Sequence, residues 1–298
     1  MHDIIIIGGG PAGLTAAIYA RRANKTVLVI EKDAFGGQMT HSPKIENYPG
    51  FSEISGLELA DKMFEQAMKL GADIEVDSVI SLKDQGGYVS VLGENGSYSA
   101  KTAIIASGAK HRKLGVYGEE EHEGNGISFC AVCDGAFYSG KEVSVIGGGN
   151  SALQEALMLS EVCTRVTVIQ NLPYLTGEDR LQKSVEAKNN ISVITDARVL
   201  GFPGESFNGV DIEAHGERAH IDCDGCFIAI GLVPDNGFAR DCVDIDGYGY
   251  VVADENCTTP SPCIFTAGDC RTKRIRQIST AIADGATAAL AAIRFLEK

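Results

Sequence analysis

Tryptophan is absent from this sequence, proline is scarce, and acidic side chains far outnumber basic ones. The 298 residues include no Trp, 8 Pro, and 26 Lys or Arg against 40 Asp or Glu, which gives a formal net charge of −14. Such a chain repels nucleic acid and anionic membrane surfaces, so we expect neither as a partner. The composition, 44% apolar and 22% charged, excludes disordered, collagen-like and coiled-coil proteins.

Long apolar runs are also missing, and none approaches the ~18–20 residues that a membrane helix needs. The sequence starts Met1-His2-Asp3, with neither a basic start nor a small-residue cleavage site. We therefore expect no signal peptide and a cytoplasmic location. Nine cysteines, an odd number, are then expected to be mostly free thiols, with room for one catalytic pair.

An internal repeat organises the chain. Residues 4–31 and 143–170 align without gaps, and each copy reads as an apolar strand, a glycine-rich turn, an apolar helix and a second strand. This order is the βαβ unit that opens a dinucleotide-binding domain, and it occurs here twice.

The first copy carries the turn Gly8-Gly9-Gly10-Pro11-Ala12-Gly13. Gly8 permits the tight turn, Gly10 lets the backbone approach a pyrophosphate, and Gly13 lets the helix pack closely on the strand. The free N–H groups of the helix N-terminus then face the phosphates. Glu31 ends the second strand, where an acid binds a ribose hydroxyl.

Two polar, glycine-rich stretches, 110–126 and 235–249, read as linkers. We predict an α/β fold of two dinucleotide-binding, Rossmann-like domains, the second inserted into the first. The first would comprise residues 1–112 and 246–298 and end in an alanine-rich helix over about 277–296. The second would comprise residues 113–245 and carry most of the negative charge.

The segment Cys130-Ala131-Val132-Cys133-Asp134 has three interpretations: a zinc half-site, two buried thiols, or a redox-active dithiol. A zinc site needs a second pair, and Cys223 with Cys226 leads into a strand, where residues i and i+3 face opposite sides. We therefore expect no metal. A dithiol is favoured, because this spacing closes a small reversible ring and the acid can move a proton.

With these motifs in order, the chain resembles the low-molecular-weight thioredoxin reductase family. The matching stretches are residues 8–13 with Glu31, 36–39, 46–51, 106–109, 130–134, 229–234, 266–269 and 276–278. The resemblance implies a flavin-dependent disulfide oxidoreductase, commonly a homodimer, that holds FAD and reduces thioredoxin.

The resemblance also implies roles for single residues. Cys130 would attack the protein disulfide, Cys133 would lie nearest the flavin, and Asp134 would be the general acid. The residues implied to bind FAD are Gly8, Gly10, Pro11, Ala12, Gly13, Glu31, Gly37, Gln38, Asn47, Ala106, Gly108, Gly268, Asp269, Arg276, Gln277 and Ile278. Without the family, Gln38, Asn47 and Gln277 read as solvated loop residues. Asp269, implied to bond the ribityl chain, also suits a helix cap.

One part of the family pattern is missing. Members that use NADPH carry a His-Arg-Arg motif and a further Arg after the second strand of the inserted domain, where this chain has Gln170-Asn171-Leu172-Pro173-Tyr174-Leu175. Losing two or three such contacts to a 2′-phosphate weakens binding by roughly 3–6 kcal/mol. Gln170 is also not the acid that would bind the ribose of NADH, so the second glycine turn has a packing explanation as well as a nucleotide one.

We therefore expect the ferredoxin-dependent branch of the family, with reduced ferredoxin as the electron donor. Ferredoxins are acidic, and basic clusters on the FAD side would attract one. The clusters are Arg21, Arg22 and Lys25; Lys110, Arg112 and Lys113; and Arg271, Lys273, Arg274 and Arg276. The alternative is an NAD(P)H-dependent thioredoxin or glutaredoxin-like reductase with an atypical nucleotide site. A flavin-binding regulatory protein is disfavoured, because Cys130, Cys133 and Asp134 are all present.

Overall fold

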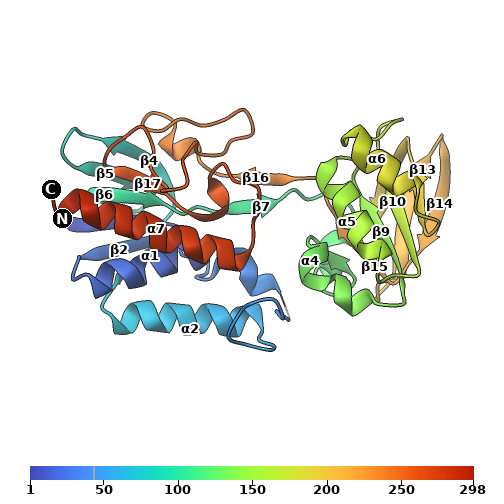
Figure 1. Ribbon diagram of the computed structural model, residues 1–298, viewed down its shortest axis with the longest axis horizontal. Coiled ribbons are helices and arrows are strands. Elements are labelled where there is room, and N and C mark those ends of the chain that lie inside the picture. Colours follow the sequence, from blue (N-terminus) through green and yellow to red (C-terminus); the bar gives the residue numbers. More distant parts are fainter. Residues whose placement is uncertain (43) are drawn as a thin grey trace. The chain divides into compact units, whose positions relative to one another are not determined.

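The computed structural model describes residues 1–42 and 44–298 (Figure 1). They form two compact units, one of residues 1–110 and 233–298 and the other of residues 111–232. The chain leaves the first unit along β7 (Ala109–His111) and returns along β16 (Leu232–Pro234), and these two short strands pair with each other. The second unit is thus an insertion in the first.

The first unit is built on a seven-stranded sheet in the order β3-β2-β1-β6-β5-β4, with β17 also paired to β6. Its strands are β1 (His2–Ile7), β2 (Val27–Glu31), β3 (Asp73–Val76), β4 (Val79–Asp84), β5 (Val89–Gly93), β6 (Ser97–Ile105) and β17 (Ile264–Thr266). β1 runs parallel to both β2 and β6, and β17 runs parallel to β6. The carboxyl ends of β1, β6 and β17 therefore meet at one edge, where ligands of parallel sheets bind.

Three long helices belong to this unit: α1 (Pro11–Arg22), α2 (Gly56–Lys69) and α7 (Ile278–Leu296). The short 3-10 helices are η1 (Gly37–His41), η3 (Gly237–Ala239) and η4 (Gly268–Cys270). Local sequence explains the helix starts. Pro11 opens α1, the Ser55 hydroxyl accepts the Glu58 N–H before α2, and Gln277 with Thr280 forms a capping box at α7.

Helix α7 lies along α1 in the core of the first unit (Figure 1). Small residues allow this approach, because a Cβ on Gly285 would lie 2.2 Å from the Ala12 carbonyl oxygen. Among the described residues, α7 alone is long and apolar enough to cross a membrane by length and composition. A core helix passes the same test, and the face of α7 bearing Ala288, Ala289 and Ala292 is fully buried.

The second unit contains a parallel five-stranded sheet in the order β11-β10-β9-β15-β8 and an antiparallel sheet of β12, β13 and β14. Its strands are β8 (Ile127–Ser128), β9 (Glu142–Ile146), β10 (Arg165–Ile169), β11 (Ile191–Ile194), β12 (Ala197–Gly201), β13 (Gly209–Ala214), β14 (Glu217–Asp222) and β15 (Gly225–Ile228). Its helices are α3 (Glu119–His122), α4 (Ala131–Asp134), η2 (Gly135–Tyr138), α5 (Asn150–Ser160) and α6 (Asp179–Glu186).

The two copies of the repeat fold as the sequence predicts. The first copy is β1-α1-β2, the second is β9-α5-β10, and both strand pairs are parallel. The α/β class and the two Rossmann-like units are therefore confirmed. The helix expected over 277–296 is α7, which begins one residue later.

The unit boundaries differ from the expected 1–112, 113–245 and 246–298, most clearly at the second one. The first unit resumes at Val233, because residues 235–249 pack onto it instead of linking the units. Ala239 and Val243 lie in its core, and buried Asn236 bonds to Ser107 Oγ and to the carbonyls of Gly249 and Cys270.

The stretch 110–126 also differs from the expected linker. The Glu119 side chain is buried and its carboxylate accepts the N–H groups of Leu114 and Gly115, at 2.9 and 2.7 Å. His122 is buried as well. This stretch is therefore a folded segment and not a linker, because buried hydrogen bonds and the apolar contacts of Leu114 and Val116 hold it.

Candidate functional site

The glycine turn of the first unit is as tight as its sequence suggests. Gly8 has φ +112°, and a Cβ there would lie 2.2 Å from the Ala106 carbonyl oxygen. Gly10 precedes α1, whose first turn has no side-chain cap and no acidic residue. A Cβ on Gly37 would lie 3.3 Å from Gly10 Cα, so η1 begins beside the turn. The backbone N–H groups at the N-terminus of α1 are thus free to bind an anion.

Glu31 lies at the edge of this turn, at the end of β2. Its Oε2 accepts the Gly9 N–H at 2.6 Å and its Oε1 accepts the Asp33 N–H at 3.0 Å. These two bonds fix the carboxylate beside the glycines. A negatively charged acceptor held there suits the hydroxyl groups of a ribose.

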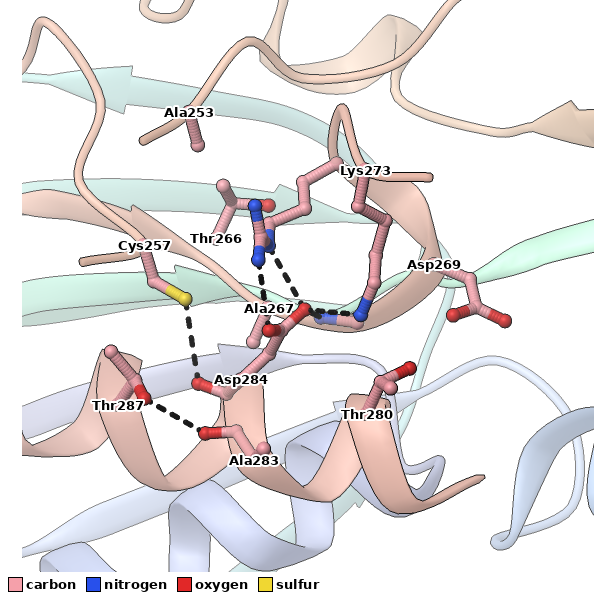
Figure 2. Close-up of polar contacts among 12 residues, drawn as sticks. Ala253, Cys257, Thr266, Ala267, Asp269, Lys273, Thr280, Ala283, Asp284 and Thr287 are labelled. Atoms are coloured by element: carbon pink, nitrogen blue, oxygen red, sulfur yellow. Dashed lines mark hydrogen bonds and ion pairs between the residues drawn. The ribbon is translucent and has the colours of Figure 1, made fainter. Parts of the chain in front are cut away.

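Asp269 is the residue of this edge whose side chain is best suited to accept a hydrogen bond from a ligand. It lies on η4, after β17, and its Oδ1 is buried without a hydrogen-bond partner in the described structure. Burial raises the pKa of this carboxyl, against the lowering effects of Lys273 and Arg276. In Figure 2 the Asp269 side chain carries no contact and points away from Asp284. A buried acceptor of this kind needs a donor, and the hydroxyls of a ribityl chain supply one.

Arg276 and Gln277 lie close to Asp269 in sequence and are held in place. The Arg276 Nε donates to the Asp269 carbonyl at 3.3 Å, and its guanidinium stacks over Tyr250, 4.1 Å from the ring centre. The Asn47 amide donates to Gln277 Oε1 at 3.2 Å. The structure therefore joins Asn47 to the start of α7.

The other expected cofactor residues lie around the same sheet edge, with one outlier. Pro11, Ala12 and Gly13 form the first turn of α1, Ala106 and Gly108 follow β6, Gly268 begins η4, and Ile278 begins α7. A Cβ on Gly268 would meet Ala12 Cβ at 2.9 Å. Gln38 is exposed on η1, and none of the contacts described above joins it to this group.

The dithiol forms a separate site in the second unit. Cys130 and Cys133 form a disulfide across the start of α4, and the Cys133 N–H points at Cys130 Sγ at 3.2 Å. Val132, between them, is 53% exposed. The disulfide is therefore presented on an accessible turn, as exchange with another protein requires.

Asp134 is connected to Cys130 through a serine. The Ser128 hydroxyl donates to Asp134 Oδ2 at 2.6 Å and accepts the Cys130 N–H at 3.1 Å. Asp134 Oδ1 is buried without a partner in the described residues, and burial raises the pKa of this carboxyl although Ser128 opposes the shift. A carboxyl with a raised pKa beside a disulfide is suited to donate a proton.

Comparison with known proteins identifies the family of the whole chain. Residues 2–285 match the family described as pyridine nucleotide-disulphide oxidoreductase. The thioredoxin reductase of Listeria monocytogenes is 39% identical over 302 residues, covering 100% of this chain and 95% of that protein. The crystal structure of thioredoxin reductase from Streptococcus pyogenes is 42% identical, with a TM-score of 0.95, over 100% of this chain and 98% of that one.

This chain belongs to the thioredoxin reductase family.

Members of the family are FAD-binding flavoproteins, and FAD is the cofactor of this chain. A second solved member, the thioredoxin reductase of Giardia duodenalis, is 33% identical with a TM-score of 0.94, covering 100% of this chain and 99% of that one. A curated relative of 39% identity, from Clostridium pasteurianum, is described as a 34.2 kDa protein in the rubredoxin operon. It covers 99% of this chain, so the likeness extends over both units.

The second glycine turn, at residues 147–149, is covered by the loop that follows β10. Gln170 is 5% exposed and donates to the Tyr174 carbonyl at 3.3 Å, and a Cβ on Gly148 would lie 2.6 Å from the Gln170 side chain. The N–H groups of Thr176 and Gly177 bond to the Gly148 carbonyl. The loop after β10 thus folds over the turn.

A carboxylate also lies at this turn. Asn150, the first residue of α5, accepts the Glu178 N–H at 2.7 Å and donates to the Glu178 carboxylate at 3.0 Å. Residues 166–178 contain no Lys or Arg. The loop between β10 and α6 therefore offers a carboxylate and no base at this turn.

The expected basic surface around Arg271 is wrong in part. Arg271 is 4% exposed, and its Nε and Nη2 each donate to Asp284 of α7 at 2.9 Å. The Lys273 ammonium bonds to the same carboxylate at 2.8 Å, and Figure 2 shows Lys273 and Asp284 turned toward one another. Two of the four bases thus share one carboxylate inside the unit and are not free surface charges, while Arg274 is exposed.

Two residues with clear structural roles were missed from the sequence: Ser128 and Asp284. An acid inside the alanine-rich α7 was the available signal for Asp284, because an apolar helix tolerates a carboxylate only with a partner. Cys223 and Cys226 are both buried free thiols of one apolar cluster. In the described part of the chain, no group of His, Cys, Asp or Glu could hold a metal ion.

Proposed function

We propose that this enzyme reduces thioredoxin through the Cys130–Cys133 dithiol and takes its electrons from reduced ferredoxin. The accessible disulfide beside a buried acid carries the first part of the proposal. It is supported by the relatives and solved structures that are themselves named thioredoxin reductases. The second glycine turn, which is covered and has no Lys or Arg in the loop after β10, carries the second part.

FAD would be held by the edge of the sheet in the first unit. The N–H groups after Gly10 would face its pyrophosphate, Glu31 its adenosine ribose, and Asp269 its ribityl hydroxyls. Asn47, Arg276 and Gln277 would frame the flavin end. Bound there, FAD can accept single electrons from a donor and supply two to a disulfide.

The dithiol would then reduce its substrate by two exchanges. The Cys130 thiolate attacks the substrate disulfide, forming a mixed disulfide and releasing one substrate thiolate, which takes a proton from Asp134. The Cys133 thiol gives up its proton and attacks Cys130. The Cys130–Cys133 disulfide re-forms, and the second substrate sulfur leaves as a thiol with that proton. Two electrons thus pass from the dithiol to thioredoxin, together with one proton from Asp134 and one from Cys133.

The composition of the loop after β10 is the basis for proposing ferredoxin as the electron donor. A 2′-phosphate needs cations, and residues 166–178 supply none. Glu178, bonded to Asn150 at the start of α5, would repel the pyrophosphate as well. Ferredoxin needs no nucleotide site, only approach to the flavin edge. Exposed Arg274, just before Arg276 and α7, is the base that we propose attracts it.

One observation favours the alternative donor, NADPH or NADH. The helix α5 begins at the glycine turn without a side-chain cap on Gly149, which is the arrangement of a dinucleotide site. An anaerobic titration of the flavoprotein separates the donors. We expect bleaching of the flavin by reduced ferredoxin and little or none by millimolar NADPH or NADH. Rapid bleaching by micromolar NADPH or NADH overturns the ferredoxin proposal.

The dithiol is tested by trapping. Cys133→Ser should leave Cys130 able to hold a single-cysteine thioredoxin as a stable mixed disulfide, whereas Cys130→Ser should trap none. Both variants should lose thioredoxin reduction and keep FAD, because the dithiol lies in the other unit from the FAD residues. Continued reduction of thioredoxin by either variant would show that the dithiol is not the route.

We further propose that the enzyme works as a cytoplasmic homodimer. Both points rest on the family resemblance and on the free thiols, which are the state expected in a reducing compartment. Light scattering on the purified FAD form should give twice the chain mass of 31.5 kDa. A single-chain mass at micromolar concentration rejects the dimer.

A further inference from the structure

A second buried carboxyl group lies at the dithiol, on α5. In the internal repeat, Glu155 stands where the first copy has Ala16, a fully buried position of α1. The same helix face is therefore apolar in one unit and carries an acid in the other. Carboxylates are rarely placed in such positions without a role, because burial disfavours their charge.

Glu155 contacts the turn that carries the disulfide. Helix α4 packs on α5, and the N–H of Ala131, directly after Cys130, bonds to the Glu155 carboxyl. The other oxygen, Oε2, is buried and has no partner among the described residues. Ala131 itself is buried, so solvent does not separate these two groups.

Among the described residues, no charged group on the neighbouring elements holds the Glu155 carboxyl in one protonation state. The ionisable groups on the elements packed against α5 are Cys130, Cys133 and Asp134 at α4; Asp179, Arg180, Lys183 and Glu186 on α6; Glu142 on β9; and Arg165 on β10. The carboxylates and bases of this set do not shift the pKa of Glu155, which burial raises to about 7 while the Ala131 N–H opposes the shift. Glu155 therefore gains and loses its proton near neutral pH.

We propose that Glu155 is a positioning residue for the dithiol, which holds the first turn of α4 by the Ala131 N–H and controls through its own charge how readily Cys130 becomes a thiolate. A neutral Glu155 leaves the N–H groups of this turn to favour a thiolate. An ionised Glu155 places a negative charge next to the same turn and therefore disfavours the Cys130 thiolate. The inference deepens the proposed exchange at Cys130 and rests on it.

The consequence is a distinctive pH dependence. As pH rises through neutrality, Glu155 ionises first, and the Cys130 thiol then titrates at a higher pH than it otherwise would. Two coupled groups titrate over a wider range than one. Asp134 acts through Ser128 on the other side of Cys130, so its removal leaves this coupling in place.

Alkylation of Cys130 measures the coupling without any electron donor. In the Cys133→Ser protein, with FAD bound, iodoacetamide is added from pH 5.5 to 9.5 and modified Cys130 is quantified by peptide mass spectrometry. We expect a broad, two-step rise of the rate with pH. Adding Glu155→Gln should give a single step at lower pH, with alkylation about three- to tenfold faster at pH 7.5, which corresponds to a thiol pKa lower by roughly half to one unit.

Two further variants serve as controls. Glu161→Gln removes an exposed carboxylate directly after the same helix and should leave the two-step profile unchanged. Glu155→Asp keeps a titrating acid and should keep two steps, which packing alone would not preserve. If Glu155→Gln fails to fold, the profile of the Cys133→Ser protein still decides, because a single step in that protein overturns the inference.

Trapping of thioredoxin in the same variants separates this inference from the proposed function. Unchanged alkylation profiles in Glu155→Gln with normal trapping overturn the role of Glu155 alone. Changed profiles with no trapping in any variant overturn thioredoxin as the substrate and leave the coupling standing.

Discussion

Arg271 donates two hydrogen bonds of 2.9 Å to the carboxylate of Asp284, and the Lys273 ammonium adds a third contact to the same group. The Gly268 N–H donates to it as well, at 3.0 Å. Asp284 thus fixes both ends of the segment that presents Asp269. These bonds keep the pKa of the Asp284 carboxyl low although burial opposes them.

Asp284→Asn should destabilise the first unit. The change leaves Arg271 and Lys273 buried without their counter-charge, for which we expect a loss of about 2–4 kcal/mol. Because the folded pKa of Asp284 is lowered, its stabilising effect is present above the ordinary carboxyl pKa and disappears as pH falls below it. Thermal unfolding at pH 7 measures the loss.

The matched control is Asp61→Asn, an exposed aspartate on α2, which should be neutral. Adding Lys273→Met to Asp284→Asn should restore part of the stability, because one of the two unpaired cations is removed. An Asp284→Asn protein as stable as the parent contradicts the assigned role.

Much of the fold follows from the repeated glycine turn, because few βαβ arrangements accommodate it. The boundaries were less accessible. Residues 235–249 look like a linker, and only the three-dimensional contacts of Asn236 and Val243 show that they belong to the first unit. The composition of a segment indicates how polar it is, but it does not show which residues elsewhere in the chain the segment contacts.

Charge was the weakest guide to the site. Arg271 and Lys273 read as surface bases, since their partner Asp284 lies 11 or more positions away on a helix of its own. The two carboxyls at the dithiol show the opposite case. Asp134 was found through its motif, whereas Glu155 could be found only by comparing the two copies of the repeat position by position.

Asp134→Asn should slow thioredoxin reduction and leave FAD bound. The amide keeps the volume and the Ser128 hydrogen bond but cannot donate a carboxyl proton, so we expect turnover to fall roughly a hundredfold or more. Stopped-flow reduction of thioredoxin by the pre-reduced enzyme measures the step. Ser128→Ala should give a smaller loss, and equal rates in all three proteins would remove Asp134 from the mechanism.

Asp269→Asn should weaken FAD binding. The buried Oδ1 needs a hydroxyl donor, and replacing a carboxylate acceptor by an amide weakens such a bond by about 1.5–3 kcal/mol, or roughly ten- to a hundredfold in Kd. Fluorescence titration of the apoprotein with FAD measures it. Asp241→Asn, at an exposed site of the same unit, is the control. Equal FAD affinity in both variants would exclude Asp269 from the FAD site.

Arg274→Glu should slow electron delivery from ferredoxin. Reversing one exposed charge near the start of α7 should lower the association rate about three- to tenfold at low salt, and the difference should shrink as salt screens the charges. Arg294→Glu reverses an exposed base in the last turn of α7, roughly 24 Å from the start of that helix, and should have little effect. Equal slowing by both variants would indicate net charge and not a docking surface.

Glu155→Gln should change how stability depends on pH. Burial raises the pKa of Glu155 to about 7 in the folded protein, against about 4.3 for an unfolded chain. Between these two values the unfolded chain has released the proton and the folded one still holds it, so stability falls as pH rises. The full loss, present above pH 7, is about 4 kcal/mol if the whole shift acts on folding. The glutamine variant avoids it.

The second unit of Glu155→Gln should therefore gain in Tm over the parent protein at pH 8 and gain little at pH 4.5. Differential scanning calorimetry at both values measures the difference, with Glu161→Gln as the exposed control that should follow the parent at each pH. The sign of the Tm difference at pH 8 decides between the possible environments of Glu155. An exposed or well-paired Glu155 would give no such trend, and an ion-paired one would give a glutamine variant that is less stable at pH 8. Only a carboxyl that the fold holds neutral, beside the turn of Cys130, gives a variant whose advantage grows as the pH rises.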